Sequence, residues 1–75
     1  MTELSEGGSL VVDARGMRCP WPALRLARAM RNAADVLLIA DDPQAGREVA
    51  ALAAEHDWLV EPATDDAERW RVRRR

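Results

Sequence analysis

The sequence predicts an α/β (α+β) two-layer sandwich, in which two helices cover one face of a four-stranded mixed sheet. Three observations lead to this prediction: short strand-like runs alternate with helical spacing, the first three elements are close together, and the last two strands are joined by a short turn. The expected element order is β-α-β-α-β-β. A chain of 75 residues has room for one core only.

The first strand and the first helix follow each other directly. The run "SLVVDA" at 9–14 is rich in β-branched residues and precedes Gly16, which predicts a strand over 10–14. From Pro22 to Ala34 the apolar side chains recur at helical spacing, at positions 23, 26, 27, 30 and 34. We therefore expect an amphipathic helix over this second stretch.

The run "VLLIA" at 36–40 is continuously apolar and flanked by acidic residues, as is typical of a central strand. Together with the preceding strand and helix it completes a unit of about 30 residues, the usual size of a βαβ motif. Such units are right-handed with parallel strands. We therefore expect the first two strands to pair in parallel.

A second helix and a final hairpin complete the predicted fold. Asp42 is expected as the N-cap and Pro43 as the first helical residue, and helical spacing continues to His56. A third strand around Trp58 and Val60 is stopped by Pro62, and "ATDDAE" at 63–68 supplies turn residues. In 69–73, Arg alternates with apolar side chains, which predicts a strand with Trp70 and Val72 facing inward.

Composition limits the function classes. We expect a flexible segment at 1–8 and a single domain at 9–75. One cysteine and one histidine form neither an internal disulfide nor a zinc site, so no metal or cofactor is expected. The amino-terminal residues lack the pattern of a secretory signal, and the longest apolar run is far shorter than the roughly 20 residues of a membrane span. A cytoplasmic protein with a reduced thiol is the expectation.

Cys19, the chain's only cysteine, lies in "DARGMRCPWP" at 13–22, where the first helix is about to begin. Pro20 and Pro22 suit this place, because the first N–H groups of a helix have no internal partner. A helix N-terminus carries partial positive charge, and Arg15 and Arg18 are close in sequence. We expect these groups to lower the pKa of the Cys19 thiol from about 8.5 and to favour the thiolate.

The surroundings of Cys19 restrict its chemistry. In a Cys-x-x-Cys dithiol the second cysteine would stand where Pro22 is, so disulfide exchange within one chain is excluded. His56, the only imidazole, is near the end of the second helix, and nothing in the sequence places it beside the thiol. A thiolate that accepts a group and surrenders it to another protein's thiol remains, and a persulfide suits that role.

Other interpretations stay open. Cys19 could be a small buried hydrophobe within an interaction or regulatory module. Trp21 could be a docking contact or a lid on local apolar surface, and Arg25 and Arg28 could meet an acidic partner or form a solvated helix face. The segment "RWRVRRR" at 69–75 invites an RNA-binding interpretation, although a net charge of −2 argues against strong phosphate binding.

These residues resemble a known family. "DARGMRCPWP" is similar to the signature of the TusA/SirA-like sulfur carriers, small proteins with a Cys-Pro-x-Pro motif just after the first strand. The resemblance also includes "IADDP" at 39–43, the chain length and the element order, and covers nearly the whole chain. Met17 stands where Leu is commoner, and Asp57 stands where the family tends to have Gly after the second helix; Asp tolerates the left-handed conformation better than most residues.

The resemblance implies a sulfurtransferase-type carrier. Cys19 would take sulfane sulfur from a cysteine desulfurase or rhodanese-like donor and pass it to an acceptor protein. Gly16, Arg18, Pro20 and Pro22 would support it as the motif, with Gly16 permitting the turn beneath the cysteine. Arg15, Trp21, Arg25 and Arg28 are candidate docking residues. Family pathways include tRNA thiolation, molybdenum-cofactor biosynthesis and sulfur oxidation.

Overall fold

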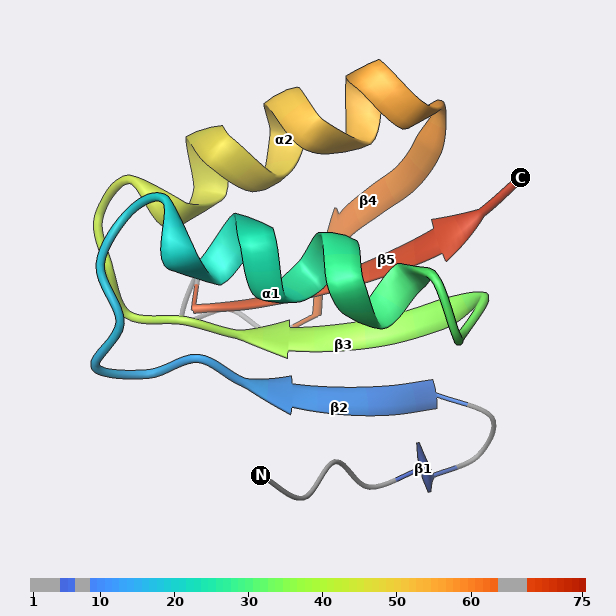
Figure 1. The fold of residues 1–75 in the computed structure, drawn as a ribbon, viewed down its shortest axis with the longest axis horizontal. Coiled ribbons are helices and arrows are strands. Elements are labelled where there is room, and N and C mark those ends of the chain that lie inside the picture. Colours follow the sequence, from blue (N-terminus) through green and yellow to red (C-terminus); the bar gives the residue numbers. More distant parts are fainter. Residues whose placement is uncertain (1–4, 7–8, 64–67) are drawn as a thin grey trace.

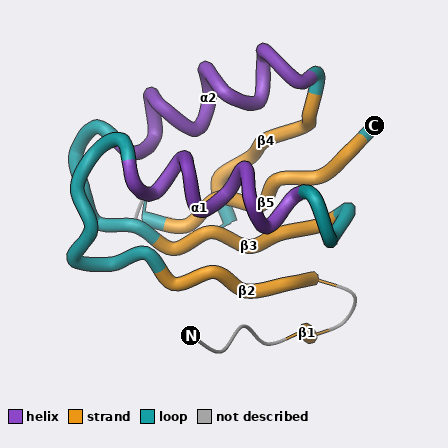
Figure 2. The backbone as a smooth tube through the Cα atoms, in the orientation of Figure 1, coloured by secondary structure: helices purple, strands orange, loops and turns teal. Residues whose placement is uncertain are grey.

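The computed structural model describes residues 5–6, 9–63 and 68–75. Their secondary structure follows the predicted order, with one short strand added at the beginning (Figures 1 and 2). The elements are β1 (Ser5–Glu6), β2 (Ser9–Asp13), α1 (Trp21–Met30), β3 (Asp35–Ile39), α2 (Ala45–His56), β4 (Trp58–Pro62) and β5 (Arg69–Arg74).

The strands form one mixed sheet in the order β1-β2-β3-β5-β4. β2 and β3 pair in parallel, with Val12 beside Leu38, which confirms the predicted βαβ unit. β5 runs antiparallel to both β3 and β4, which confirms the terminal hairpin. Both helices lie on the same side of the sheet (Figure 1). The two-layer α+β sandwich predicted from the sequence is therefore confirmed.

β1 is the fifth strand, one more than the sequence predicts. It consists of two residues paired antiparallel to β2, with Ser5 beside Leu10. The other residues of the predicted flexible segment 1–8 lie outside the described residues. Most of the predicted turn at 63–68 also lies outside them.

The core lies between the sheet and the helices. Leu26 and Met30 of α1 and Val49 of α2 are fully buried against strand residues of the same face. Those strand residues are Val12, Val36, Leu38 and Val72. Burying a side chain of this size contributes about 1.5–3 kcal/mol. As predicted, Val72 points inward, and Trp70 packs on the core from a partly buried position.

The structure corrects the ends of both helices. α1 ends at Met30 and not at Ala34, because the N–H groups of Asn32 and Ala33 both bond to the Ala29 carbonyl and turn the chain toward β3. α2 begins at Ala45, two residues after Pro43. Asp42 holds the preceding turn: its carbonyl accepts a hydrogen bond from the Ala45 N–H at 2.9 Å.

Asp57 ends α2 in the left-handed conformation, with φ of 60°. This conformation usually requires glycine, and aspartate is among the few other residues that adopt it at modest cost. The chain thereby reverses direction directly into β4. Asp57 thus adopts the left-handed conformation that a helix-ending glycine would take.

Candidate functional site

Two loops lie side by side where β2 and β3 end (Figure 1). We call them the Cys19 loop (residues 14–20) and the Asp42 loop (residues 40–44). Parallel strands bring their carboxyl ends to the same edge, so the loops that follow them meet there. The Ala14 N–H donates to the Ile39 carbonyl at 2.7 Å, and the Gly16 N–H donates to Asp41 Oδ1 at 2.9 Å.

Gly16 makes the first turn of the Cys19 loop possible. Its φ is +85°, a left-handed conformation that other residues adopt only under strain. The turn closes with a hydrogen bond of 3.2 Å from the Met17 N–H to the Ala14 carbonyl. The turn expected at Gly16 is thus present immediately ahead of the cysteine.

Cys19 is exposed and precedes α1 by two residues. Pro20 occupies the N-cap and joins Cys19 through a cis peptide bond, while Pro22 is the second helical residue. The first helical hydrogen bond runs from the Leu24 N–H to the Pro20 carbonyl at 3.1 Å. Both prolines therefore stand where a missing N–H costs little, as the sequence predicts.

Asp42 connects the cysteine to the start of α2. Its Oδ2 accepts a hydrogen bond from the Cys19 backbone N–H, and its Oδ1 accepts one from the Gln44 N–H at 2.8 Å. These two bonds, chiefly the one from Gln44, hold the pKa of Asp42 below its ordinary value, and the positive charge of Arg18 adds to the effect. Asp42 is therefore a backbone anchor for both loops.

The electrostatic expectation for Cys19 is wrong. The pKa of the thiol is raised above its ordinary value of 9.0, first because the surrounding chain partly desolvates the sulfur. The negative charges of Glu48 and Asp42 raise it further. Desolvation and these carboxylates thus favour the neutral thiol at neutral pH.

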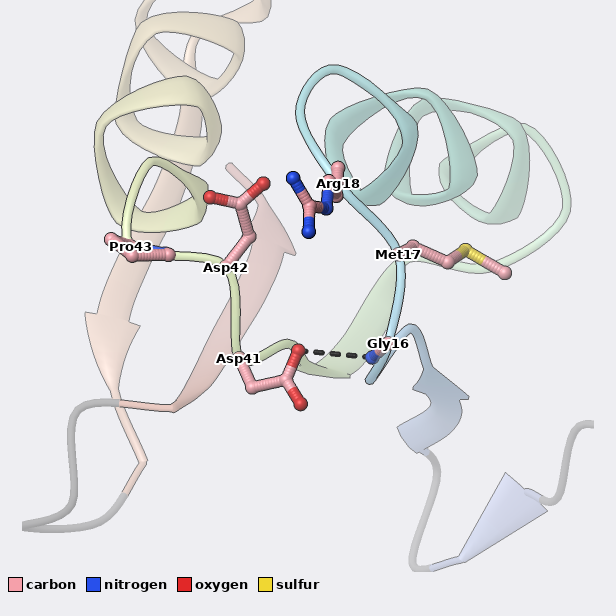
Figure 3. A pocket seen from close by; sticks show the side chains of 6 residues that line it. All are labelled: Gly16, Met17, Arg18, Asp41, Asp42 and Pro43. Atoms are coloured by element: carbon pink, nitrogen blue, oxygen red, sulfur yellow. Dashed lines mark hydrogen bonds between the residues drawn. The ribbon is translucent and has the colours of Figure 1, made fainter.

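Arg15 does not supply the expected positive charge to the sulfur. Its guanidinium forms a two-pronged ion pair with Asp13, at 3.0 and 2.8 Å. This pair lowers the pKa of Asp13 to about 2. Arg18 points instead toward Asp42 (Figure 3). The two arginines thus act on carboxylates, Asp13 at the end of β2 and Asp42 in the Asp42 loop.

An open pocket of about 490 Å³ lies between the two loops (Figure 3). Its lining combines one cation, two carboxylates and apolar atoms. The lining residues are Gly16, Met17, Arg18, Asp41, Asp42 and Pro43. Cys19 follows the lining residue Arg18 in the chain.

The candidate docking residues divide into two places. Trp21, Arg25 and Arg28 follow one face of α1, at the i, i+4, i+7 spacing that aligns helical side chains. Trp21 is 60% exposed, as a docking contact requires. Arg25 also approaches the Met17 sulfur at 3.9 Å. Arg15 lies apart in the Cys19 loop, paired with Asp13.

His56 is at the far end of α2 from the Asp42 loop, stacked on Trp58 with ring centroids 4.5 Å apart. The structure therefore does not bring it to Cys19.

Several arginines of the carboxyl-terminal segment have partners within the chain, which weakens the RNA-binding interpretation. Arg71 pairs with Asp35, Arg73 with Glu61 and Arg75 with Asp57, and Arg74 donates to the Met30 carbonyl.

Within residues 5–6, 9–63 and 68–75, no three His, Cys, Asp or Glu side chains are grouped as a metal site would require. Over the same part of the chain, no helix has the length and apolar character needed to cross a membrane. Asp41 and Asp42, the adjacent carboxylates that could suggest a metal site or acid–base work, accept backbone hydrogen bonds from the Cys19 loop.

Glu48 is the site residue that the sequence analysis missed. It belongs to the first turn of α2, and its N–H donates to the Gln44 carbonyl at 3.0 Å. The sequence does indicate that Glu48 lies near the start of the second helix, because it comes six residues after Asp42, the expected N-cap. Only the tertiary contact between the loops shows that this end of α2 faces the cysteine.

A family model described as "Sulfurtransferase TusA" matches residues 10–75, which is nearly the whole chain. The matched range begins within β2 and includes both loops of the site.

Proposed function

The chain belongs to the TusA sulfurtransferase family, and on that premise we propose that Cys19 carries sulfane sulfur as a persulfide between two proteins. The Cys19 sulfur attacks the outer sulfur of a donor persulfide, and the donor's sulfur–sulfur bond breaks. The donor cysteine leaves with the bond's electron pair and the proton lost by Cys19. The carrier then holds one extra sulfur, with no change in the total number of electrons.

The observation that carries this proposal is the exposure of the chain's only cysteine at the joined loops. A carrier must present its sulfur to two different proteins in turn, so its sulfur has to lie at the surface. The absence of a second cysteine means that the bound sulfur is not lost to an internal disulfide. Gly16, Pro20 and Pro22 hold the cysteine in this place through the backbone.

The proposed partners are a cysteine desulfurase or rhodanese-like donor and a downstream acceptor protein. Trp21 and Leu24, 60% and 50% exposed, lie just after the cysteine and offer apolar contact area. Arg25 and Arg28 offer positive charge on α1, which would suit an acidic patch on a partner. Sulfur delivery to tRNA thiolation, molybdenum-cofactor formation or sulfur metabolism in the cytoplasm would fit this role.

The test is the intact mass of the protein after incubation with L-cysteine and a cysteine desulfurase. We expect the wild-type chain to gain the mass of one sulfur atom, and a thiol reductant to remove it. Cys19→Ser should gain nothing while keeping its circular dichroism spectrum, since the side chain is exposed. The expected loss of loading is complete.

Failure of the wild-type chain to gain sulfur from both a desulfurase and a rhodanese-type donor would contradict the carrier function. It would favour the alternative, an interaction or regulatory module on the same fold with an incidental thiol. Loading that persists in Cys19→Ser would contradict the assignment of the cysteine.

A further inference from the structure

The peptide group that leads into Cys19 is held at both of its ends. Its N–H, which belongs to Cys19, donates to Asp42 Oδ2, and its carbonyl, which belongs to Arg18, accepts the Trp21 N–H at 2.8 Å. The second bond closes a local turn, whereas the first comes from a residue 23 positions later in the chain. The orientation of this peptide group is therefore fixed from two independent directions.

Asp42 is itself held by the start of α2. Its Oδ1 accepts the Gln44 N–H at 2.8 Å, and its carbonyl accepts the Ala45 N–H at 2.9 Å. The residue is half-buried, and the pKa of its carboxyl lies below the ordinary value chiefly because of the Gln44 and Cys19 N–H groups. Asp42 is therefore ionised at neutral pH, and a charged acceptor makes a stronger hydrogen bond than a neutral one.

We propose that Asp42 is a positioning residue for sulfur transfer, which acts through the Cys19 N–H to fix the direction in which the sulfur leaves the backbone. The preceding peptide group is held, and Pro20 restricts the backbone on the other side of the cysteine. Rotation about the Cα–Cβ bond is then the main freedom left to the thiol. This role rests on the proposed function, because it serves the same transfer.

Direction matters because the transfer is a displacement at sulfur. The Cys19 sulfur forms a bond with the outer sulfur of the donor persulfide while the bond to the donor cysteine breaks. The donor cysteine leaves with the electron pair and takes up the proton that Cys19 loses, and the three sulfur atoms lie nearly in line. A reactant misplaced by about 1 Å can react about 100-fold more slowly. A donor protein brings its persulfide from one direction, whereas a small persulfide adjusts its approach.

Asp41, the adjacent carboxylate, holds a different part of the Cys19 loop. It accepts the Gly16 N–H at 2.9 Å, three residues ahead of the cysteine (Figure 3). Two further residues lie between, so this bond sets the course of the loop but not the orientation of the peptide group at Cys19. Among the described residues, Asp42 is the side chain that accepts the Cys19 N–H.

Asp42 also affects the sulfur through its charge, and that effect has the opposite sign. Its negative charge, like that of Glu48, raises the pKa of the Cys19 thiol. Removal of either charge therefore increases the thiolate and speeds reaction with a small reagent. Loss of positioning slows the transfer from a protein, so one variant of Asp42 separates the two roles.

The experiment measures three reactions of the full chain at pH 7: alkylation by iodoacetamide, loading from glutathione persulfide, and single-turnover loading from a persulfide-bearing cysteine desulfurase or rhodanese. For Asp42→Ala we expect the first two to become up to about tenfold faster, the change in thiolate that one pKa unit produces. The maximal rate of loading from the protein donor should fall about 10- to 100-fold. The carrier concentration at half-saturation should change less than about threefold, because docking is unaffected.

Two further variants serve as controls. Glu48→Gln removes a charge that raises the pKa of the thiol from outside the Cys19 loop, so it should speed alkylation without lowering the maximal rate of protein-donor loading. Asp42→Asn keeps one acceptor oxygen for the two N–H groups and should recover part of the maximal rate lost in Asp42→Ala. Circular dichroism at the assay temperature establishes that each variant is folded.

A maximal rate in both Asp42 variants that equals or exceeds the wild-type value would overturn the positioning role while leaving the carrier function intact. A rise in the half-saturation concentration alone would overturn it in favour of a docking contact. A fall in all three rates would also overturn it, because it would indicate a general loss of access to the sulfur. Absence of loading in the wild-type chain from every donor would overturn the carrier function as well.

Discussion

The Cys19 loop and the Asp42 loop lie against each other, and in the hydrogen bonds between them one loop supplies the donors and the other the acceptors. The Cys19 loop supplies backbone N–H donors, from Gly16 and Cys19. The Asp42 loop supplies side-chain acceptors, from Asp41 and Asp42, and one of these also serves its own Gln44. The shape of the reactive loop is therefore held by carboxylates that come more than twenty residues later in the chain.

The same asymmetry governs the two helix starts. The first turn of α1 contains no acidic residue and has no side-chain cap, whereas the first turn of α2 contains Glu48. By itself, α1 would favour an anion at Cys19. At Cys19, desolvation of the sulfur and the negative charges of Glu48 and Asp42 favour the neutral thiol instead. Carboxylates near the start of α2 thus affect the titration of a residue at the start of α1.

The largest effect is expected when the shared acceptor is removed. Asp42→Ala deprives both the Cys19 and the Gln44 N–H groups of their partner. Amide hydrogen exchange at these two residues should accelerate by about 10- to 150-fold, the equivalent of the about 1.5–3 kcal/mol that a hydrogen bond to a charged group contributes. Nuclear magnetic resonance measures each amide separately.

Asp41→Ala is the matched control, because it removes the acceptor of Gly16 alone. Its exchange effect should be confined to that amide. Equal protection of Cys19 in Asp42→Ala and in the wild type would contradict the idea that the Asp42 loop holds the Cys19 loop.

A smaller effect is expected from the backbone of the Cys19 loop. Gly16→Ala places a side chain at φ of +85°, where no neighbouring atom obstructs it, so the cost is conformational only. We expect the free energy of unfolding to fall by about 1–2 kcal/mol, measured by urea denaturation. Gly16→Asn should lose less, because asparagine adopts the left-handed conformation more readily. Equal losses in both variants would point to a cause other than φ.

Local sequence patterns were sufficient to predict the helices and strands. The helical spacing after Pro22 and the apolar run at 36–40 depend on burial against a single core, and the βαβ handedness follows from general rules, so the fold was predictable. The position of Cys19 ahead of a helix was predictable for the same reason, because proline is restricted to the start of a helix.

The charge around the sulfur was not predictable from neighbouring residues. Arg15 and Arg18 precede Cys19 by four residues and one residue, but their guanidinium groups turn to Asp13 and Asp42. Glu48 is distant in sequence and adjacent in space. Side-chain direction depends on which partners the tertiary fold brings near, and a pKa is set by those partners within a few ångströms.

The smallest effect is expected from titrating the shared acceptor, since Asp42 lies near solvent. Its pKa in the folded chain is below the ordinary value of 3.8, because the Gln44 and Cys19 N–H groups favour the carboxylate. A group whose pKa is lowered by folding stabilises the fold above its unfolded pKa and loses that contribution as the pH falls through the folded value.

The Cys19 and Gln44 amide shifts should therefore move together, with a midpoint below 3.8, and remain constant in Asp42→Asn. The Arg15 amide, which donates to Asp13, should instead follow a separate transition near the Asp13 pKa of about 2. A Cys19 transition that follows the Arg15 amide would show that the two loops share one titration, and would contradict the separate role of Asp42.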